Sequence, residues 1–254
     1  AETRERVQTL ARELNYSINL GAKNLRLQRN HTIAVVIPYD AVSRQHITDP
    51  FFLSILGGLA DAITDRGYDM LLSRVDAENL DAAARLVDAG VAIGVVLIGQ
   101  WRHHDQLNEL AARKLPIVVW GAQLPRQMYC TVGGDNQRGG RLAAEHLLKQ
   151  GRKRIVFLGD PQLPEVAQRL EGYHAALATA KVTARAELEL AVPFEVGAAR
   201  AAVVSLLDRK VVFDAVIGCS DLLAISAMQV LREHGRDVPR DVAVVGYDDL
   251  LLAN

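Results

Sequence analysis

Cysteine is scarce in this 254-residue sequence, which contains only Cys130 and Cys219. The two residues lie 89 positions apart and form no CxxC pair. This spacing excludes a disulfide framework and a cysteine-based metal site, and it favours the reducing cytoplasm. The neighbours His103 and His104 resemble a metal-binding pair only superficially, because adjacent residues point apart on a helix and no third ligand is spaced to join them. We expect a solvated loop there. We therefore expect neither a metal nor a cofactor.

Long apolar runs are also absent, although half of the residues are hydrophobic. No run reaches the ~18 residues that a membrane-spanning helix needs. The N-terminal stretch AETRERVQTLARELNY is charged and amphipathic, and it lacks the apolar core of a secretory signal. We expect no membrane association and no export. The chain does not begin with Met and stops without a turn at Asn254, so we interpret it as a piece of a longer protein.

The small net charge of −1 is unevenly distributed. Residues 1–30 carry six basic and three acidic groups, whereas the remaining 224 residues carry 23 basic and 27 acidic groups. A basic arm ahead of a mildly acidic body suggests that the arm contacts a polyanion. Within the arm, Val7, Leu10 and Leu14 are spaced as one face of a helix that Thr3 can cap, and this face needs a partner.

From residue 32 onward, short segments rich in β-branched residues alternate with amphipathic segments. Continuous apolar strands covered by helices indicate parallel sheets that are buried on both faces. The pattern predicts an α/β fold of two doubly wound parallel-sheet lobes, joined near residues 133–136. We expect strands at 32–38, 69–75, 94–99, 116–120, 154–160, 187–191, 215–220 and 242–248, with helices at 50–66, 80–88, 105–114, 164–178, 198–207 and 222–234.

Aromatic residues make up only 5% of the chain, yet several follow predicted strands. Ligands of open parallel sheets bind beyond the carboxyl ends of the strands. Aromatic rings there would cover the C–H faces of a sugar, while carboxylate and guanidinium groups bind its hydroxyls. We therefore expect a mono- or disaccharide ligand. The predicted site comprises Phe51, Phe52, Arg74, Trp101, Trp120, Arg169, Phe194 and Asp221.

More ordinary roles stay open for four of these residues. Trp101 and Trp120 are alternatively core residues, and Arg169 is alternatively a charge on a helix surface. Asp221 is alternatively the N-cap of the helix that follows it, and it can serve in both roles.

Several words of the sequence occur in a specific order and spacing: TRERV, TIAVVIP, DPFF, GGDNQRGGRLAAEHLLKQGRKRI, RLEGY, CSDLLAISAMQVLREHG and VPRDVAVVGYDD. Together they resemble the LacI/GalR family of bacterial transcription factors, from residue 3 to the end. The resemblance implies a periplasmic-binding-protein-like fold with three parts. These are a remnant of a DNA-binding headpiece with a hinge (1–31), an N-terminal effector-binding lobe (32–134) and a truncated C-terminal lobe (135–254).

The resemblance also assigns roles in the hinge and the cleft. Residues 3–14 would be the third helix of a helix-turn-helix domain whose first two helices are missing, so this chain should bind operator DNA poorly. Leu25 would insert into a minor-groove step, which costs a few kcal/mol of unstacking, and Ala22 and Arg26 would line or reach into that groove. Leu25 is alternatively an ordinary helix residue. Gly121 stands where several relatives have an Asp, so we expect stacking on Trp120 to replace that polar contact.

These expectations describe a sugar-responsive transcriptional repressor that binds operator DNA as a homodimer, in the bacterial cytoplasm at the nucleoid. Sugar would close the lobes and separate the two hinges, shifting the population away from the DNA-binding state. One alternative is a sugar-binding protein of the same fold that serves transport, which would need an export signal. Another is an enzyme, but no nucleophile–base pair, paired carboxylates or phosphate loop can be placed at a strand end, and we interpret Asp248 and Asp249 as a turn.

Overall fold

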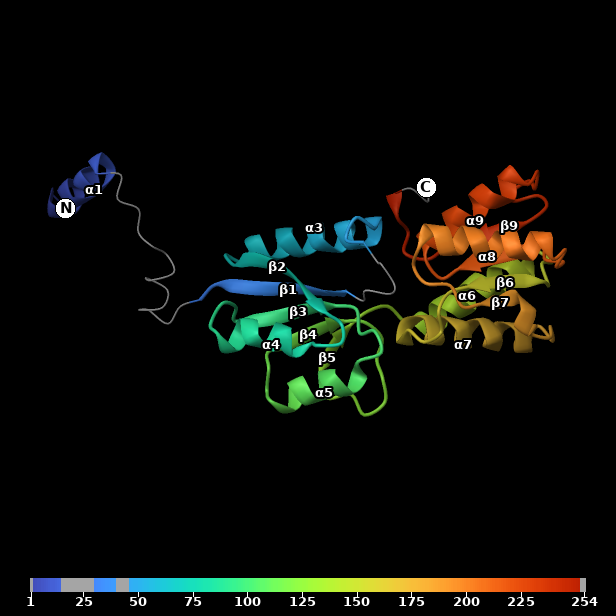
Figure 1. The fold of residues 1–254 in the computed structure, drawn as a ribbon, viewed down its shortest axis with the longest axis horizontal. Helices are drawn as coiled ribbons and strands as arrows, with labels where there is room; N and C mark the ends of the chain where they lie inside the picture. The colour runs from blue at the N-terminus through green and yellow to red at the C-terminus, as the bar shows by residue number, and fades with distance from the viewer. Residues whose placement is uncertain (1, 15–29, 40–45, 252–254) are drawn as a thin grey trace.

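The structure of the protein is a computed structural model that describes residues 2–14, 30–39 and 46–251. Two α/β lobes follow one another along the chain, and helix α1 (Glu2–Glu13) precedes them (Figure 1). Helix α1 already includes Thr3, so the predicted cap at this residue is wrong. The apolar residues Val7 and Leu10 of α1, and Leu14 directly after it, are exposed, so the described part of the chain leaves this face uncovered.

The first lobe contains a five-stranded parallel sheet with the strand order β2-β1-β3-β4-β5. Its strands are β1 (Thr32–Tyr39), β2 (Asp69–Asp76), β3 (Gly94–Ile98), β4 (Ile117–Trp120) and β5 (Cys130–Val132). Its helices are α3 (Pro50–Thr64), α4 (Asp81–Asp88) and α5 (His104–Ala112).

The alternation of side chains along β1 explains why both faces of this sheet are covered. Ala34 and Val36 pack with residues of α4 and α5 on one face. Val35 and Ile37 point the other way and pack with residues of α3. A strand that is buried on both sides reads as a continuous apolar run, which is the pattern that predicted it.

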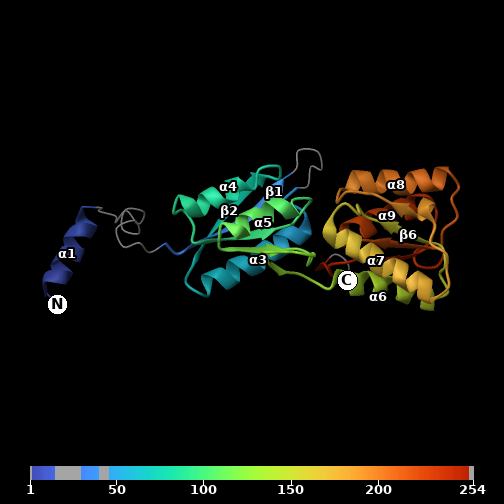
Figure 2. The same cartoon turned by 90° about the horizontal axis from the view of Figure 1, so that it is seen from below.

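The second lobe contains a four-stranded parallel sheet with the order β7-β6-β8-β9. Its strands are β6 (Ile155–Leu158), β7 (Glu189–Leu190), β8 (Ala215–Gly218) and β9 (Ala243–Val245). Its helices are α6 (Asn136–Lys149), α7 (Pro164–Thr179), α8 (Val196–Asp208) and α9 (Asp221–Glu233), and a 3₁₀ turn, η1 (Ala186–Leu188), precedes β7. Figure 2 shows α6, α7 and α8 around this second sheet.

The two parallel sheets confirm the predicted fold class, but several strands are shorter than expected. The strand expected at 187–191 is reduced to two residues because η1 takes up its beginning. The strand expected at 242–248 ends at Val245, and Asp248 and Asp249 then bend with φ of 109° and 56°. Such positive φ values cannot continue a strand, so the chain bends away from the sheet at this pair. Within the described ranges, no helix has both the length and the apolarity to cross a membrane.

Helices α6 and α7 approach each other closely because glycines lie at their crossing. A Cβ atom at Gly140 of α6 would collide with main-chain atoms of Arg169 on α7. A Cβ atom at Gly172 of α7 would collide with the carbonyl group of Gln137 on α6. The two helices can therefore touch backbone to backbone, and this contact positions Arg169.

The same substitution at two helical glycines should have opposite effects on stability. Gly172→Ala should lower the free energy of unfolding by about 1–3 kcal/mol, because the methyl group forces α6 and α7 apart. Gly57→Ala on α3, where no atom lies within 4 Å of the added Cβ, should raise it by about 0.5–1 kcal/mol through helix propensity. Urea unfolding followed by circular dichroism measures both. Equal effects of the two substitutions would contradict the close helix contact.

Candidate functional site

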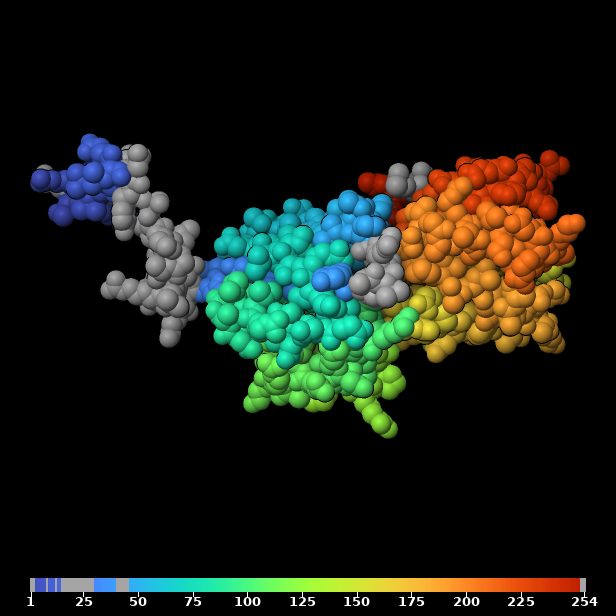
Figure 3. All heavy atoms as spheres, viewed as in Figure 1, coloured from blue at the N-terminus to red at the C-terminus, as the bar shows by residue number. Residues whose placement is uncertain are grey.

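A cavity of about 470 Å³ lies between the two lobes. Figure 3 shows the surfaces of the first and second lobes in contact with each other. The first lobe contributes the start of α3 and the residues that follow β3, β4 and β5. The second lobe contributes the start of α6 and the residues that follow β6, β7, β8 and β9. The cavity thus lies beyond the carboxyl ends of both parallel sheets, where this fold class binds ligands.

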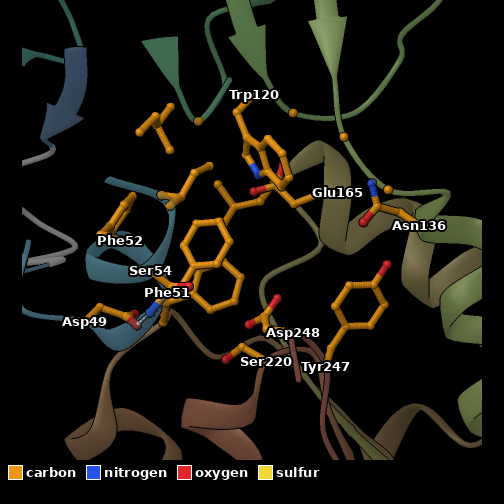
Figure 4. A pocket seen from close by; sticks show the side chains of 18 of the residues that line it. Asp49, Phe51, Phe52, Ser54, Trp120, Asn136, Glu165, Ser220, Tyr247 and Asp248 are labelled. Atoms are coloured by element: carbon orange, nitrogen blue, oxygen red, sulfur yellow. Dashed lines mark hydrogen bonds between the residues drawn. The ribbon is translucent and has the colours of Figure 1, made fainter. Parts of the chain in front are cut away.

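Aromatic rings form one wall of the cavity (Figure 4). The ring centroids of Phe51 and Phe52 are 5.5 Å apart in an edge arrangement, and those of Phe51 and Trp120 are 6.3 Å apart. Trp120 is 36% exposed, so it is not a core residue. Phe194 adds a ring from the second lobe. Rings in such arrangements offer an extended apolar surface to the flat face of a ligand.

Trp101 combines two roles that were separate alternatives in the sequence. It lines the cavity, and it also packs against the apolar core of the second lobe, although it belongs to the first. Its φ of 49° is unusual for a residue other than glycine and turns the chain sharply after β3. Trp101 therefore connects the two lobes beside the cavity.

Gly121 is explained by packing behind the aromatic wall. The amide of Gln100 donates to the carbonyl of Ala122 at 2.6 Å and accepts from its N–H at 2.7 Å. A Cβ atom at Gly121 would lie 2.6 Å from carbons of the Gln100 side chain. A larger residue at position 121 would therefore displace this buried amide, so the polar contact that an Asp would make is unavailable here.

Arg169 on α7 is held on three sides at the cavity wall. Its Nε donates to Asn136 Oδ1 at 2.9 Å, and a terminal nitrogen donates to the carbonyl of Cys219. Its guanidinium carbon lies 3.6 Å from the centre of the Tyr247 ring, which is a cation–π contact. These contacts exclude the alternative of a free charge on a helix surface. They also fix the guanidinium before any ligand arrives.

Asp221 is buried, with 4% of its surface exposed, and it lies behind the cavity rather than in its lining. Its Oδ2 accepts a hydrogen bond from Leu250 N–H at 2.8 Å, and its own N–H donates to the carbonyl of Tyr247 at 2.7 Å. The alternative role as N-cap is wrong, because Ser220 caps α9 through Leu223 N–H. Asp221 instead holds the segment after β9 in place.

The structure thus brings six of the eight predicted site residues into the cavity lining: Phe51, Phe52, Trp101, Trp120, Arg169 and Phe194. Arg74 is not among them. It lies exposed on β2, with its guanidinium carbon 5.3 Å from the centre of the Tyr39 ring. The predicted DNA-contacting residues Ala22, Leu25 and Arg26 lie outside the described residues.

Three carboxyl groups of the lining were not predicted, namely Asp49, Glu165 and Asp248 (Figure 4). Asp49 accepts from Phe51 N–H at 3.0 Å and caps α3, and burial raises its pKa. Burial also raises the pKa of Glu165, and the positive charge of Arg169 opposes this increase. Burial raises the pKa of Asp248 to about 7; Arg169 opposes this shift, and the charges of Asp221 and Asp49 add to it. Asp248 is exposed as a whole residue, but Figure 4 shows its carboxyl group turned toward the cavity.

Sequence position offered a signal for two of these three residues. Asp49 precedes the start of a helix, and Asp248 follows a strand of the second sheet. Glu165 offered none, because its burial depends on side chains of other segments. The loop expected at His103 and His104 includes His103, which precedes α5, but it is wrong for His104, which begins α5 and whose Nδ1 lies 2.9 Å from the Tyr129 hydroxyl. In the described part of the chain, no three His, Cys, Asp or Glu side chains are grouped to hold a metal.

Comparison with known proteins adds to this geometry. A family model for a periplasmic binding protein-like domain matches residues 144–254. The HTH-type transcriptional regulator CelR of Thermobifida fusca is 35% identical over 260 residues, which cover 99% of this chain and 74% of CelR. A solved LacI-family regulator from Bacillus cereus aligns with a TM-score of 0.80 at 25% identity, over 88% of this chain and 80% of that one. The chain belongs to the LacI/GalR family of transcriptional regulators.

Further members of the LacI/GalR family agree with this assignment. The structure of a CelR–cellobiose complex matches with a TM-score of 0.77 and 32% identity, covering 99% of this chain and 75% of that one. The transcriptional repressor CytR of Escherichia coli is 28% identical over 253 residues, which cover 98% of this chain and 72% of CytR. These relatives are regulators of transcription, so the predicted family is confirmed, and the comparison favours a regulator over a transport protein.

The raised pKa of Asp248 predicts a pH-dependent contribution to stability. Because the folded state holds this proton up to about pH 7 and the unfolded state only up to about pH 3.8, the contribution is complete below pH 3.8 and lost as the pH rises through 7. Asp248→Asn removes the charge, and Asn tolerates the positive φ. The variant should be more stable than the wild type at pH 8, and this gain should shrink toward pH 5.

Urea unfolding at several pH values between 5 and 8 checks this prediction. Asp61→Asn, at an exposed position on α3, serves as the matched control and should show no pH-dependent gain. A gain at Asp248→Asn that is the same at pH 5 and pH 8 would refute the assigned protonation.

Proposed function

We propose that this protein is a DNA-binding repressor whose operator affinity changes when a saccharide binds between the two lobes. The observation that carries the proposal is the composition of the cavity: aromatic rings on one wall, with a fixed guanidinium and carboxyl groups around them. Rings cover the apolar face of a sugar, and charged groups hydrogen-bond its hydroxyls. The protein would act in the cytoplasm as a homodimer without enzymatic activity.

The effector we propose is a disaccharide such as cellobiose. The similar regulator CelR has been solved with cellobiose bound, and that chain aligns with 99% of this one. A volume of about 470 Å³ is within the usual range of ~300–1,000 Å³ for small-molecule sites. Phe51 and Trp120 would cover one sugar ring, and Phe194 would approach from the opposite lobe. Asp221 would act as a positioning residue through Tyr247 and Leu250, and Arg74 remains a predicted contact without support from the cavity lining.

Contacts between the lobes supply the means of regulation. A terminal guanidinium nitrogen of Arg102 in the first lobe lies 3.3 Å from Asp160 Oδ2 in the second lobe. Gln168 Nε2 of the second lobe donates to the carbonyl of Gln123 in the first at 2.9 Å. An exposed ion pair is worth only ~0–1 kcal/mol, so a bound ligand can readily shift the balance between arrangements of the lobes. We propose the parts 1–31, 32–134 and 135–254 as headpiece with hinge, first lobe and second lobe. The shift would reach DNA through the dimer contact and the hinge residues Ala22, Leu25 and Arg26.

The aromatic wall predicts a large effect of one substitution on sugar binding. Trp120→Ala should weaken the binding of cellobiose about tenfold or more, because it removes the largest ring of the wall. Val118→Ala, two residues earlier on the same strand and outside the cavity lining, should leave the affinity within about twofold. Isothermal titration calorimetry measures both. If no mono- or disaccharide binds or raises the melting temperature while a nucleotide or an amino acid does, the sugar assignment is wrong.

Operator binding separates a regulator from a transport protein. In the protein extended by a complete headpiece, saturating cellobiose should change operator affinity about tenfold, a coupling of about 1.4 kcal/mol. Leu25→Ala should weaken operator binding and leave the affinity for cellobiose unchanged, because the minor-groove wedge is lost and the cavity is intact. Fluorescence anisotropy with labelled DNA measures the first effect and calorimetry the second. Operator affinity that does not respond to a bound saccharide would exclude the regulatory role.

A further inference from the structure

Among the described residues, the buried side-chain polar atom without a hydrogen-bond partner is Oε2 of Glu165, a residue of the cavity wall. Glu165 stands at the second position of α7 and lines the cavity, where Figure 4 shows it beside Trp120. Its Oε2 is closed off from solvent and has no hydrogen-bond partner within the described residues. A buried polar atom without a partner is costly, and native structures tolerate few of them without a functional reason.

The guanidinium of Arg169 does not form a hydrogen bond with Oε2 of Glu165. Arg169 follows Glu165 by one helical turn, but its guanidinium is already engaged by Asn136, by the carbonyl of Cys219 and by the ring of Tyr247. An engaged guanidinium lowers the cost of the neighbouring carboxylate without bonding to it. The described residues therefore leave this acceptor without a donor, and a donor brought by a ligand is what it lacks.

The charge of the lining points in the same direction. Among the described residues that line the cavity, three carry carboxyl groups and only Arg169 carries a guanidinium. The aromatic rings of the wall also present the negative faces of their π-systems, which attract cations and repel anions. A negative charge on the ligand would be repelled by these carboxylates.

We propose that Glu165 is a specificity-determining residue through which the cleft selects saccharides by charge. Its carboxylate accepts a hydrogen bond from a hydroxyl of a neutral sugar, and it forms an ion pair with the ammonium group of an amino sugar. A uronate or a phosphate on the ligand offers only acceptors and negative charge to the same oxygen. The expected order of affinity is therefore amino sugar first, neutral sugar second and acidic sugar last. This inference rests on the proposed function and names the class of saccharide that the same site accepts.

Three disaccharides of the same linkage test the proposal by calorimetry at pH 7. They are cellobiose, the β-1,4-linked disaccharide of glucosamine, and the β-1,4-linked disaccharide of glucuronic acid and glucose. The wild type should bind the amino disaccharide several-fold more tightly than cellobiose, and the uronate at least tenfold more weakly. Glu165→Gln keeps the shape and one acceptor but removes the charge. It should reduce the ratio between the amino and uronate affinities at least fivefold.

Glu171→Gln is the matched control, because Glu171 is an exposed glutamate on the same helix outside the cavity lining. It should leave all three affinities unchanged, and melting curves of both variants establish that they fold. If cellobiose binds but the three ligands agree within threefold, the proposed function stands and the charge selection is wrong. The same holds if Glu165→Gln keeps the wild-type ratio, as it would if the carboxyl group is protonated in the complex. If none of the three binds at millimolar concentration, this inference fails, whereas the proposed function fails only if no other mono- or disaccharide binds either.

Discussion

Arg169 is the side chain on which the geometry of the cleft depends. It begins on α7, and its guanidinium contacts the start of α6, the end of β8 and the segment after β9. These segments lie far apart in the sequence, so one residue holds together the rim of the second lobe. A planar guanidinium is suited to this task because its donors lie in a fixed plane and its flat face stacks on an aromatic ring. Its own position depends in turn on the glycine-mediated approach of α6 and α7.

The cleft contains two kinds of polar side chain: some are held in place by hydrogen bonds within the second lobe, and others are carboxyl groups whose ionisation can respond to a ligand. Arg169 and Asp221 are bonded within the second lobe and keep their arrangement without a ligand. Asp49, Glu165 and Asp248 line the cavity, and burial raises the pKa of each. Carboxyl groups in this state are sensitive to a neighbour, because a hydrogen-bond donor or a positive charge stabilises the ionised form. Pre-organised groups limit the entropy lost on binding, and the responsive groups distinguish between ligands.

The contacts that join the two lobes include an aromatic side chain and an ion pair at the surface. Trp101 crosses from the first lobe to pack on the core of the second, while the ion pair of Arg102 and Asp160 is partly open to solvent. A family of regulators that respond to a small molecule requires this balance, since a ligand can shift an equilibrium only by its differential affinity for the two arrangements.

The sequence by itself determined the parallel sheets, the two-lobe order and most of the aromatic wall. Strands such as β1 are apolar at every position because both faces are covered, and residues after such strands meet at one edge of the sheet. Only the tertiary structure decided which polar groups face the cavity. Asp221 is turned away because Leu250, 29 residues later, donates to its carboxylate, and Glu165 is buried by segments that no local pattern connects to it. Local spacing encodes backbone direction, whereas the partner of a polar side chain depends on which distant segments the packing brings within hydrogen-bond distance.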